Sequence, residues 1–443
     1  MRLSRLAFHA ASAGRADAVA PFYLDLVECA RSRHAYVEAE ALYSRALGQL
    51  PETALGQRAS ALRGRGLMRY RLSRHDSVDD LMAALAAVRS LHDRTAEIDI
   101  ILEAATAYDW MVEYRKSREL VNEAAGLFAA AEAESDLLRA SLLVGEARAL
   151  WRFSEGKQAI DKFRQANAIA ERLGDAGYEI RVLSLLLLGD LLPFNGQVAE
   201  AEKISETVIS LCEAHGDQAH LMVAVANRRQ LWIGRGDVAR AVADTQRSIQ
   251  IAREIGYVAG CFMGEYNLGE LLYQSGDADA AEEHVRRAVD LEQKRLSGIP
   301  RPVAELLEAR VLAFLGRDAD ARARYNAIAA VQTEAERTGQ SEKLLLPNER
   351  VLLSLVDLCT RDATPEECQA LRTRADADSI ESELIEVVEM IGLSAVRRGR
   401  TEFGRAQLAE ARRVAERIPN VMGSRLHREP SAAVRGPSQL NAS

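Results

Sequence analysis

The sequence predicts an all-α protein, a right-handed solenoid of stacked helix hairpins with a period of about 40 residues. Composition is the first observation: of 443 residues, 48% are hydrophobic, 5% are aromatic and ten are proline, which favours helices over sheets. The second is a series of glycines, each 40 residues from the last: Gly156, Gly196, Gly236, Gly276 and Gly316. The third is a second series of glycines, which follow the first series by about 20 residues and mark the end of each 40-residue unit: Gly174, Gly216, Gly256, Gly298 and Gly339.

Each unit is therefore expected to be a helix, a glycine turn, a second helix and a second glycine stop. Glycine reaches positive φ at no steric cost, so it can end a helix and reverse the chain. Five positions after the turn glycine, most units have an alanine, which lets the second helix lie close to the first. These positions are Asp161, Ala201, Ala241, Ala281 and Ala321. One hairpin cannot bury its apolar faces alone, so the hairpins are expected to stack.

The unit from Tyr266 to Gln293 resembles the tetratricopeptide repeat family. That family's Leu, Gly, large residue, Gly, Ala and Ala are matched by Leu268, Gly269, Leu272, Gly276, Ala281 and Ala288. An earlier unit matches at Ala39, Tyr43, Ala46 and Pro51. The period exceeds the family's usual value of about 34, and the pattern is interrupted at Arg228, Arg229 and Glu308. The resemblance implies a superhelix whose first helices line a concave, peptide-binding groove.

In chain order the pattern predicts four parts. Residues 1–133 form degenerate hairpins, with turns at Gly14, at 73–77 and at 114–117. Residues 134–339 form five regular hairpins, and residues 340–418 form further degenerate hairpins. In that third part Pro347 should start or kink a helix, Pro365 should start one, and Gly399 should turn the last pair. From Pro419 the periodicity is lost, so residues 419–443 are predicted to be disordered.

The N-terminal stretch lacks the polar capping helix that a solenoid usually has at each end. It resembles the start of the helical array in large bacterial signalling ATPases of the STAND type. The residues that carry this second resemblance are Leu6, Ala7, His9, Ala10, Ala13, Gly14, Ala18 and Tyr23. It implies a regulatory arm, attached or detached, of a signalling ATPase, protein kinase or cyclase.

Motifs for catalysis or cofactor binding are not found in the sequence. There is no GxxxxGK[ST] phosphate loop, no HExxH and no GxSxG. The eight histidines are dispersed, and His215 and His220 lack a nearby third ligand. We therefore predict no metal, no cofactor and no enzymatic activity.

Charge and cysteine content bear on partners and compartment. The chain has 57 basic and 65 acidic residues, a net charge of −8, which makes nucleic acid an unlikely partner. Its five cysteines are scattered, without a CxxC pair, as in a reducing compartment. The longest apolar run, Val182 to Phe194, is too short to span a membrane. A cytoplasmic protein without membrane contact is expected.

A polar ladder is the first candidate site. The residues six positions before each turn glycine are Leu150, Asp190, Gln230, Glu270 and Arg310. Asn227 and Asn267 share a second register, nine positions before the glycine. By the tetratricopeptide resemblance these positions line the groove, where repeated donors and acceptors suit an extended or helical ligand. The alternative is that any wet concave surface is polar.

An arginine cluster is the second candidate site: Arg63, Arg65, Arg69, Arg71 and Arg74. Residues 1–75 hold 12 arginines against 6 acids, a net of +6, which leaves −14 for the remainder. Arginine binds carboxylates and phosphates through two parallel hydrogen bonds. The cluster therefore predicts an anionic partner, or alternatively a solvated helix face or an internal dock on the chain's own acids.

Two functions are compatible with these features. The first is a non-catalytic scaffold that binds a protein or peptide, for example a kinase or ATPase module, in the groove. The second is an effector-sensing arm whose ligand shifts a population between closed and open assemblies. A reading frame for a kinase or ATPase module next to this one would favour the second.

Overall fold

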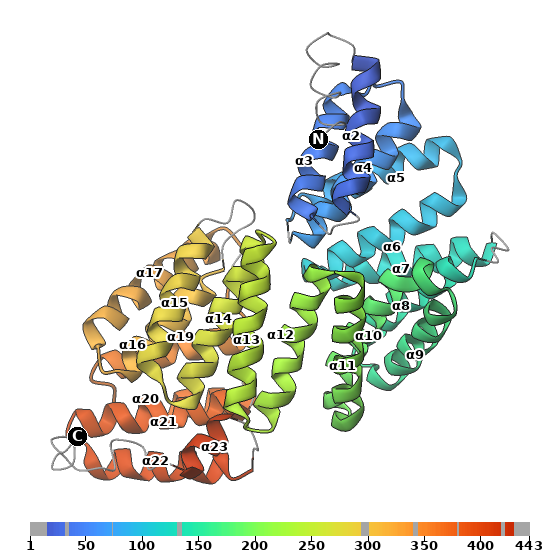
Figure 1. Ribbon diagram of the computed structural model, residues 1–443. Coiled ribbons are helices and arrows are strands. Elements are labelled where there is room, and N and C mark those ends of the chain that lie inside the picture. The colour runs from blue at the N-terminus through green and yellow to red at the C-terminus, as the bar shows by residue number, and fades with distance from the viewer. Residues whose placement is uncertain are drawn as a thin grey trace. The chain divides into compact units, whose positions relative to one another are not determined.

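The computed structural model describes residues 16–31, 35–72, 74–130, 135–293, 301–339, 344–378, 381–417 and 421–428 (Figure 1). Every regular element in these ranges is a helix, so the predicted all-α class is confirmed. The turn predicted at Gly14 lies outside the described residues, as does Gly298. No described helix is both long enough and apolar enough to cross a membrane.

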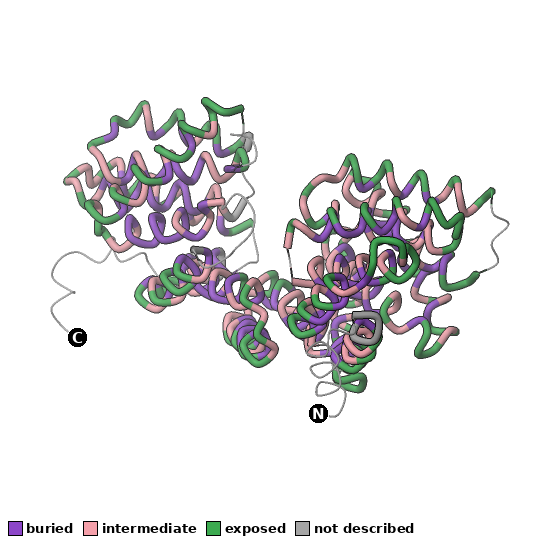
Figure 2. The backbone as a smooth tube through the Cα atoms, turned by 90° about the horizontal axis from the view of Figure 1, so that it is seen from above, coloured by how far each residue is buried: buried purple, intermediate pink, exposed green. Residues whose placement is uncertain are grey.

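The chain forms two compact units, which we describe separately. The first comprises Met1–Asn227 and Ile251–Ala259, and the second comprises Arg228–Gln250 and Gly260–Ser443. In each, we call the first helix of a hairpin the A helix and the second the B helix. Figure 2 shows that the helices bury one side and expose the other, as expected when amphipathic hairpins stack.

The first unit is built of consecutive hairpins. Its helices are α2 (Ala16–Arg31), α3 (Tyr36–Gln49), α4 (Leu55–Arg71), α5 (Ser77–Leu91), α6 (Arg94–Trp110), α7 (Tyr114–Ala130), α8 (Asp136–Arg152), α9 (Gly156–Arg172), the short 3-10 helix η1 (Gly174–Gly177), α10 (Tyr178–Phe194), α11 (Val198–His215) and the first part of α12 (Gln218–Gly234). Leu102 on α6, Val121 on α7 and Leu142 on α8 belong to one buried apolar cluster, which joins neighbouring hairpins.

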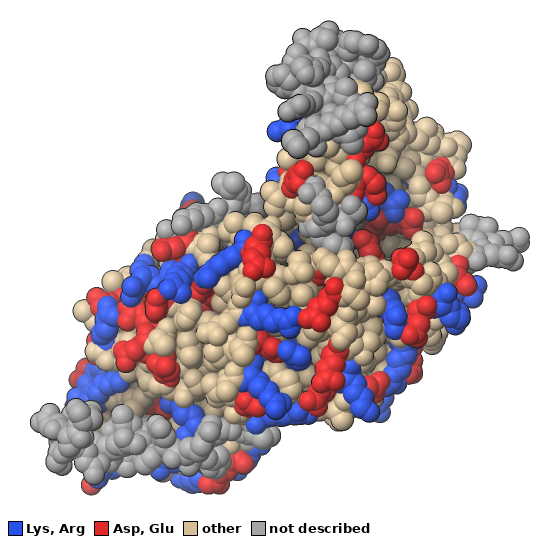
Figure 3. All heavy atoms as spheres, in the orientation of Figure 1, with Lys and Arg blue, Asp and Glu red and all other residues tan. Residues whose placement is uncertain are grey.

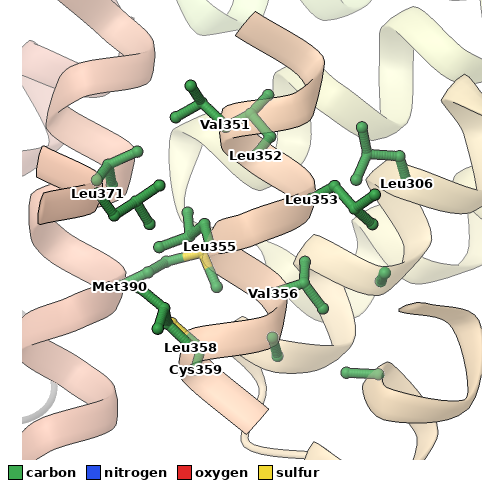
Figure 4. Packing of buried hydrophobic residues seen from close by; sticks show 14 of the residues in the cluster. Leu306, Val351, Leu352, Leu353, Leu355, Val356, Leu358, Cys359, Leu371 and Met390 are labelled. Carbon is green, nitrogen blue, oxygen red and sulfur yellow. The ribbon is translucent and has the colours of Figure 1, made fainter. Parts of the chain in front are cut away.

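The second unit continues this pattern and ends with a differently packed group of helices. Its helices are the end of α12, α13 (Val238–Glu254) up to Gln250, α14 (Val258–Ser275) from Gly260 onward, α15 (Ala278–Gln293), α16 (Val303–Phe314), α17 (Asp318–Arg337), α19 (Pro347–Thr360), α20 (Pro365–Asp378), α21 (Glu381–Arg397), α22 (Thr401–Ala415) and α23 (Val421–Arg428). Figure 4 shows Leu355 and Leu358 of α19 beside Met390 of α21, and Leu353 beside Leu306 of α16; all five are buried in one cluster.

Four of the five predicted turn glycines are confirmed. The φ angle is +74° at Gly196, +69° at Gly236, +100° at Gly276 and +78° at Gly316. The alanines five positions later, Ala201, Ala241, Ala281 and Ala321, are fully buried, as close helix packing requires. The turn expected at 114–117 is displaced, because Tyr114 already begins α7 and Val112 is the residue with positive φ.

The prediction for Gly156 is wrong. Gly156 is the first residue of α9, and the left-handed residue of this turn is Ser154, with φ of +68°. The turn of the α8–α9 hairpin therefore lies two residues earlier in its repeat than the turns of the four hairpins that follow. Counting from Ser154, the fifth residue is Ala159, which is fully buried, whereas Asp161 lies at the surface.

Replacing Ser154 by glycine should stabilise the protein. A left-handed backbone costs an L-residue about 1–2 kcal/mol that glycine does not incur, so we expect Ser154→Gly to raise the free energy of unfolding by about 1 kcal/mol. The control is Ala83→Gly in the exposed interior of α5, where glycine should lower stability by about 1 kcal/mol. Urea unfolding followed by circular dichroism measures both, and a loss of stability in Ser154→Gly would contradict the assignment.

Helix α23 departs from the predicted disorder after Pro419. Its side chains Val421, Met422 and Leu426 are buried, which explains why this short segment is helical. The predicted disorder therefore does not hold for residues 421–428, and residues 429–443 lie outside the described part of the chain.

Helices α21 and α23 cover the ends of α14 and α16 in the second unit (Figure 1). Arg397 of α21 donates hydrogen bonds to the carbonyl oxygen of Ala313, at 2.8 Å, and to that of Phe314. The Arg425 side chain of α23 lies beside Gly276 and over the Phe314 ring, 5.8 Å from its centroid. Val421 packs in one cluster with Trp232 and Leu271, so the turns of these hairpins are enclosed by the C-terminal helices.

Candidate ligand-binding groove

A cavity of about 180 Å³ lies among the A helices of the first unit. Its lining residues come from α4, α6, α8, α10 and α12, which are the first helices of five successive hairpins. Apolar walls are formed by Leu67, Leu102, Val144, Ile180 and Leu183. The polar lining includes Tyr70, Arg71, Thr106, Ser141, Glu179 and His220. We call this surface the A-helix groove.

Arg71 contributes a positive charge to the groove. Its Nη2 atom lies 2.9 Å from Glu179 Oε1, and its guanidinium stacks over the Tyr36 ring, 4.9 Å from the centroid. Burial alone would lower the pKa of Arg71, but Tyr36 and the carboxylates of Glu179 and Asp217 together raise it above its usual value. Arg71 in turn lowers the pKa of Glu179, so both groups are charged at neutral pH.

A second ion pair borders the groove on the α6 side. Arg63 donates to both oxygens of Glu103, at 2.8 and 2.7 Å, and lies 3.3 Å from Asp99. Both carboxylates line the cavity. Burial raises the pKa of each, and Arg63 opposes that rise. The groove therefore carries positively and negatively charged side chains next to its apolar lining. Such a surface suits a ligand with polar groups at defined positions.

His220 enters the groove from the first turn of α12. Asp217 caps this helix by accepting a hydrogen bond from the His220 backbone nitrogen at 3.1 Å. The other Asp217 oxygen lies 2.6 Å from His220 Nδ1 and accepts a bond from the Tyr178 hydroxyl at 3.1 Å. The buried carboxylate thus fixes the imidazole ring at the edge of the cavity.

The ladder of the first unit contains an arginine that the glycine count missed. Six positions before Ser154 stands Arg148 rather than Leu150, and six positions before Val112 stands Thr106. Arg148 is 2% exposed and donates to Thr106 Oγ1 at 2.7 Å. Burial lowers its pKa, although Asp109 lies 3.8 Å away. Corrected for the offset, this register is polar in every hairpin from α6 to α17.

Asp190 follows Arg148 in the ladder. Asn227 donates to its Oδ2 atom at 3.1 Å, so these two predicted groove residues are in contact in the first unit. Burial raises the pKa of Asp190 to about 7, and Arg152 acts in the opposite direction.

This shift predicts a pH-dependent stability. Because the folded-state pKa lies above the unfolded value of about 4, the folded state holds an extra proton between about pH 4 and pH 7. The free energy of unfolding therefore falls as the pH rises through that window. Asp190 is half-buried, so we expect a fall of about 2 kcal/mol rather than the larger value for full burial.

Asp190→Asn should remove this fall in stability, and the exposed Asp161→Asn should leave it unchanged. Urea unfolding from about pH 4 to about pH 7.5 measures the effect. An unaltered pH profile in Asp190→Asn would contradict the prediction.

The ladder of the second unit divides into accessible and buried members. Gln230 is exposed, and Asn267 and Glu270 are half-buried. Arg310 is 3% exposed and forms two hydrogen bonds to Glu386 of α21, one of them with Nε to Oε1 at 2.7 Å. Tyr273 donates to the same carboxylate at 2.9 Å. Arg310 therefore fixes α21 against α16 and would reach a ligand only by breaking this pair.

The arginine cluster on α4 is bonded to the chain's own acids. Arg65 donates to both oxygens of Asp80, at 2.7 and 2.6 Å. Arg69 donates to Glu40 and to Asp80, each at 3.0 Å. Arg74 is paired in the same way with Asp76. A partner's anion would have to displace these carboxylates, and on the face seen in Figure 3 basic and acidic side chains are likewise interspersed. Of the five arginines, Arg71 lines the cavity.

No protein-family model matches the chain, and no curated protein does. Solved structures do. Aspartyl phosphate phosphatase F from Bacillus subtilis matches with a TM-score of 0.55 and 12% identity, over 82% of this chain and 94% of that one. A Rap protein complexed with competence and sporulation factor has a TM-score of 0.51 and 11% identity, over 91% and 98%. The apo quorum sensor NprR from B. thuringiensis has a TM-score of 0.50 and 14% identity, over 76% and 97%.

At these identities the comparisons define the fold. The chain is a helical-repeat solenoid of the tetratricopeptide type, as the sequence resemblance implied. The resemblance of its N-terminal stretch to STAND-type ATPases stays a prediction.

Proposed function

We propose that the chain is a non-catalytic scaffold that binds a protein or peptide partner in the A-helix groove. The observation that carries the proposal is the cavity itself, which is lined by the A helices of five successive hairpins and by no B helix. Rigid stacked hairpins hold its polar groups in place, so little entropy is lost on binding. The partner complexed in one similar structure, competence and sporulation factor, supports a peptide or small protein as the ligand class.

The contact residues that we propose follow from accessibility. In the A-helix groove of the first unit they are Arg71, Glu179 and His220, which line the cavity. The accessible ladder residues are proposed as additional contacts, each within its own unit: Asp190 and Asn227 in the first, and Gln230, Asn267 and Glu270 in the second. Arg310 has a structural role in this proposal, because its ion pair with Glu386 is buried.

The proposal can be tested with a variant in which a bulky side chain fills the groove. Ser141 lines the cavity, so Ser141→Phe places a ring in the space that a ligand would occupy. The matched control is Ser90→Phe on the exposed side of the B helix α5. Partners captured by the wild-type protein would be identified by mass spectrometry, and their dissociation constants measured by calorimetry.

We expect Ser141→Phe to weaken binding at least tenfold, or about 1.4 kcal/mol, and Ser90→Phe to leave it unchanged. The triple variant Asn227→Ala/Gln230→Ala/Asn267→Ala tests the contribution of the ladder side chains to binding, because it leaves the cavity lining unchanged. Unchanged binding in both Ser141→Phe and the triple variant would place the site elsewhere and refute the proposal.

An effector-sensing arm is the second candidate function, and the size of the cavity favours it. A volume of about 180 Å³ accommodates a compact molecule or a single side chain more readily than a long extended chain. A small effector would raise the thermal midpoint of the wild-type protein, and the rise would grow with the logarithm of the effector concentration above its dissociation constant. Ser141→Phe should abolish that rise, and a rise that survives in Ser141→Phe would exclude the cavity as the effector site.

A further inference from the structure

Large apolar side chains are exposed at three successive A-to-B turns of the first unit. Trp110 and Val112 at the α6–α7 turn are 59% and 62% exposed. Phe153 at the α8–α9 turn is 37% exposed, and Phe194 at the α10–α11 turn is 84% exposed. We call these four residues the turn edge of the first unit. A solvated turn normally carries polar residues, so a row of this kind marks an interaction surface.

The three turns are adjacent in space. Arg152, at the end of α8, donates to both oxygens of Asp109 near the end of α6, at 3.1 and 2.9 Å. A Cβ atom placed on Gly156 would lie 3.3 Å from the side chain of Asn195, which joins the second turn to the third. The exposed side chains therefore belong to one continuous edge.

The corresponding edge of the second unit is covered by the chain itself. Phe314 stands two residues before Gly316, in the register of Phe194 before Gly196 and of Trp110 before Val112. There the helix-end carbonyls of Ala313 and Phe314 accept hydrogen bonds from Arg397 of α21. The second unit thus shows what type of segment covers such an edge.

Further along this covered edge, Arg425 of α23 stacks over the Phe314 ring and Val421 of the same helix fills an apolar pocket beside Trp232. The covering element is helical, apolar on one side and arginine-bearing.

The same chemistry is available on the uncovered edge. The C-terminal end of each A helix carries partial negative charge on its last carbonyl groups, which attracts a guanidinium group. Exposed Trp and Phe rings offer faces for stacking with arginine and apolar area for burial. Arg118 already lies 3.7 Å above the Phe153 ring, which shows that a guanidinium fits against this edge.

We propose that the turn edge of the first unit binds an arginine-bearing amphipathic helix of a partner protein, in the way that α21 and α23 cover the turn edge of the second unit. This surface lies on the A-to-B turns and shares no residue with the lining of the A-helix groove, so the inference does not depend on the proposed function. The Trp110 ring does pack edge-on against the groove residue Tyr70, 6.2 Å between centroids, and Phe194→Ser therefore serves to separate the two surfaces.

The test is a selection from a display library of random 20-residue peptides against the full chain. Counter-selection uses the variant Trp110→Ser/Val112→Ser/Phe194→Ser. Recovered peptides are then titrated against a Trp151→Phe/Trp232→Phe background, in which Trp110 is the single tryptophan and reports directly from the turn edge. The control variant is Leu137→Ser, which removes an exposed apolar side chain near the start of α8, away from the turns.

We expect enriched peptides with an apolar helical stripe and flanking arginines, which shift the Trp110 emission to shorter wavelength. Phe194→Ser should weaken their binding at least tenfold, and Leu137→Ser should leave it unchanged. Three results would overturn the proposal: no enrichment, enriched peptides that are acidic or bind the triple variant equally well, or sedimentation showing that the wild-type chain dimerises and that Phe194→Ser makes it monomeric. The last result would assign the edge to a second copy of this chain.

Discussion

Glu386→Gln should destabilise the second unit by about 3–5 kcal/mol, because it leaves a buried guanidinium without its counter-charge. Glu386 is 2% exposed, and its carboxylate accepts hydrogen bonds from Arg310 and from Tyr273. The next carboxylate, that of Glu270, lies 3.9 Å from Arg310 and is too distant for full compensation. Urea unfolding followed by Trp232 fluorescence, in a Trp110→Phe/Trp151→Phe background, reports on this unit.

The matched control removes both charges. Arg310→Met/Glu386→Leu replaces the pair with apolar groups of similar length, and such replacements are often neutral or stabilising. We expect the double variant to recover most of the stability that Glu386→Gln loses, apart from about 1 kcal/mol for the Tyr273 hydroxyl that no longer has an acceptor. A loss below 1 kcal/mol in Glu386→Gln would show that the pair does not hold α21 in place.

Gly404→Ala should destabilise the α21–α22 hairpin by about 3 kcal/mol, at the upper end of the usual overpacking cost. A Cβ atom at Gly404 would lie 2.7 Å from the carbonyl oxygen of Gly392 and 2.5 Å from a methyl carbon of Val396. The backbones of the two helices meet at this point, so neither can move without opening the hairpin. Thermal unfolding by circular dichroism measures the change.

Gly126→Ala on α7 is the control for this substitution. No atom lies within 4 Å of a Cβ placed at Gly126, so alanine should raise stability there by about 1 kcal/mol through its helix propensity. Equal effects of the two substitutions would mean that helix propensity, rather than steric contact, governs Gly404.

The sequence predicts the repeated part of the fold because its signal is local. A glycine at the turn and an alanine five positions later act within one hairpin, and four of five hairpins follow that rule. The rule fails at Gly156 because Ser154 adopts the left-handed conformation, and nothing in the sequence forces a serine to do so. This two-residue offset moves the ladder position from Arg148 to Leu150, so the glycine spacing does not identify the buried arginine that bonds to the cavity-lining Thr106.

The candidate site was less predictable because its contacts are not local. Glu386 is 76 residues from Arg310, and Asp109 is 43 residues from Arg152, so periodicity gives no information about either pair. The arginines of α4 could be found by counting, but their acidic partners could not. One signal was available for His220: Asp217 precedes it by three residues, as in a capped first helical turn.

The groove has a mechanical consequence. In a solenoid each hairpin touches only its neighbours, so the array can open one repeat at a time, and its unfolding is graded. A ligand seated in the cavity would contact A helices from Leu67 to His220 simultaneously. It would therefore add further contacts between distant repeats to the Arg71–Glu179 ion pair, which already links α4 to α10. The loaded first unit should then unfold more cooperatively under force or denaturant than the free one.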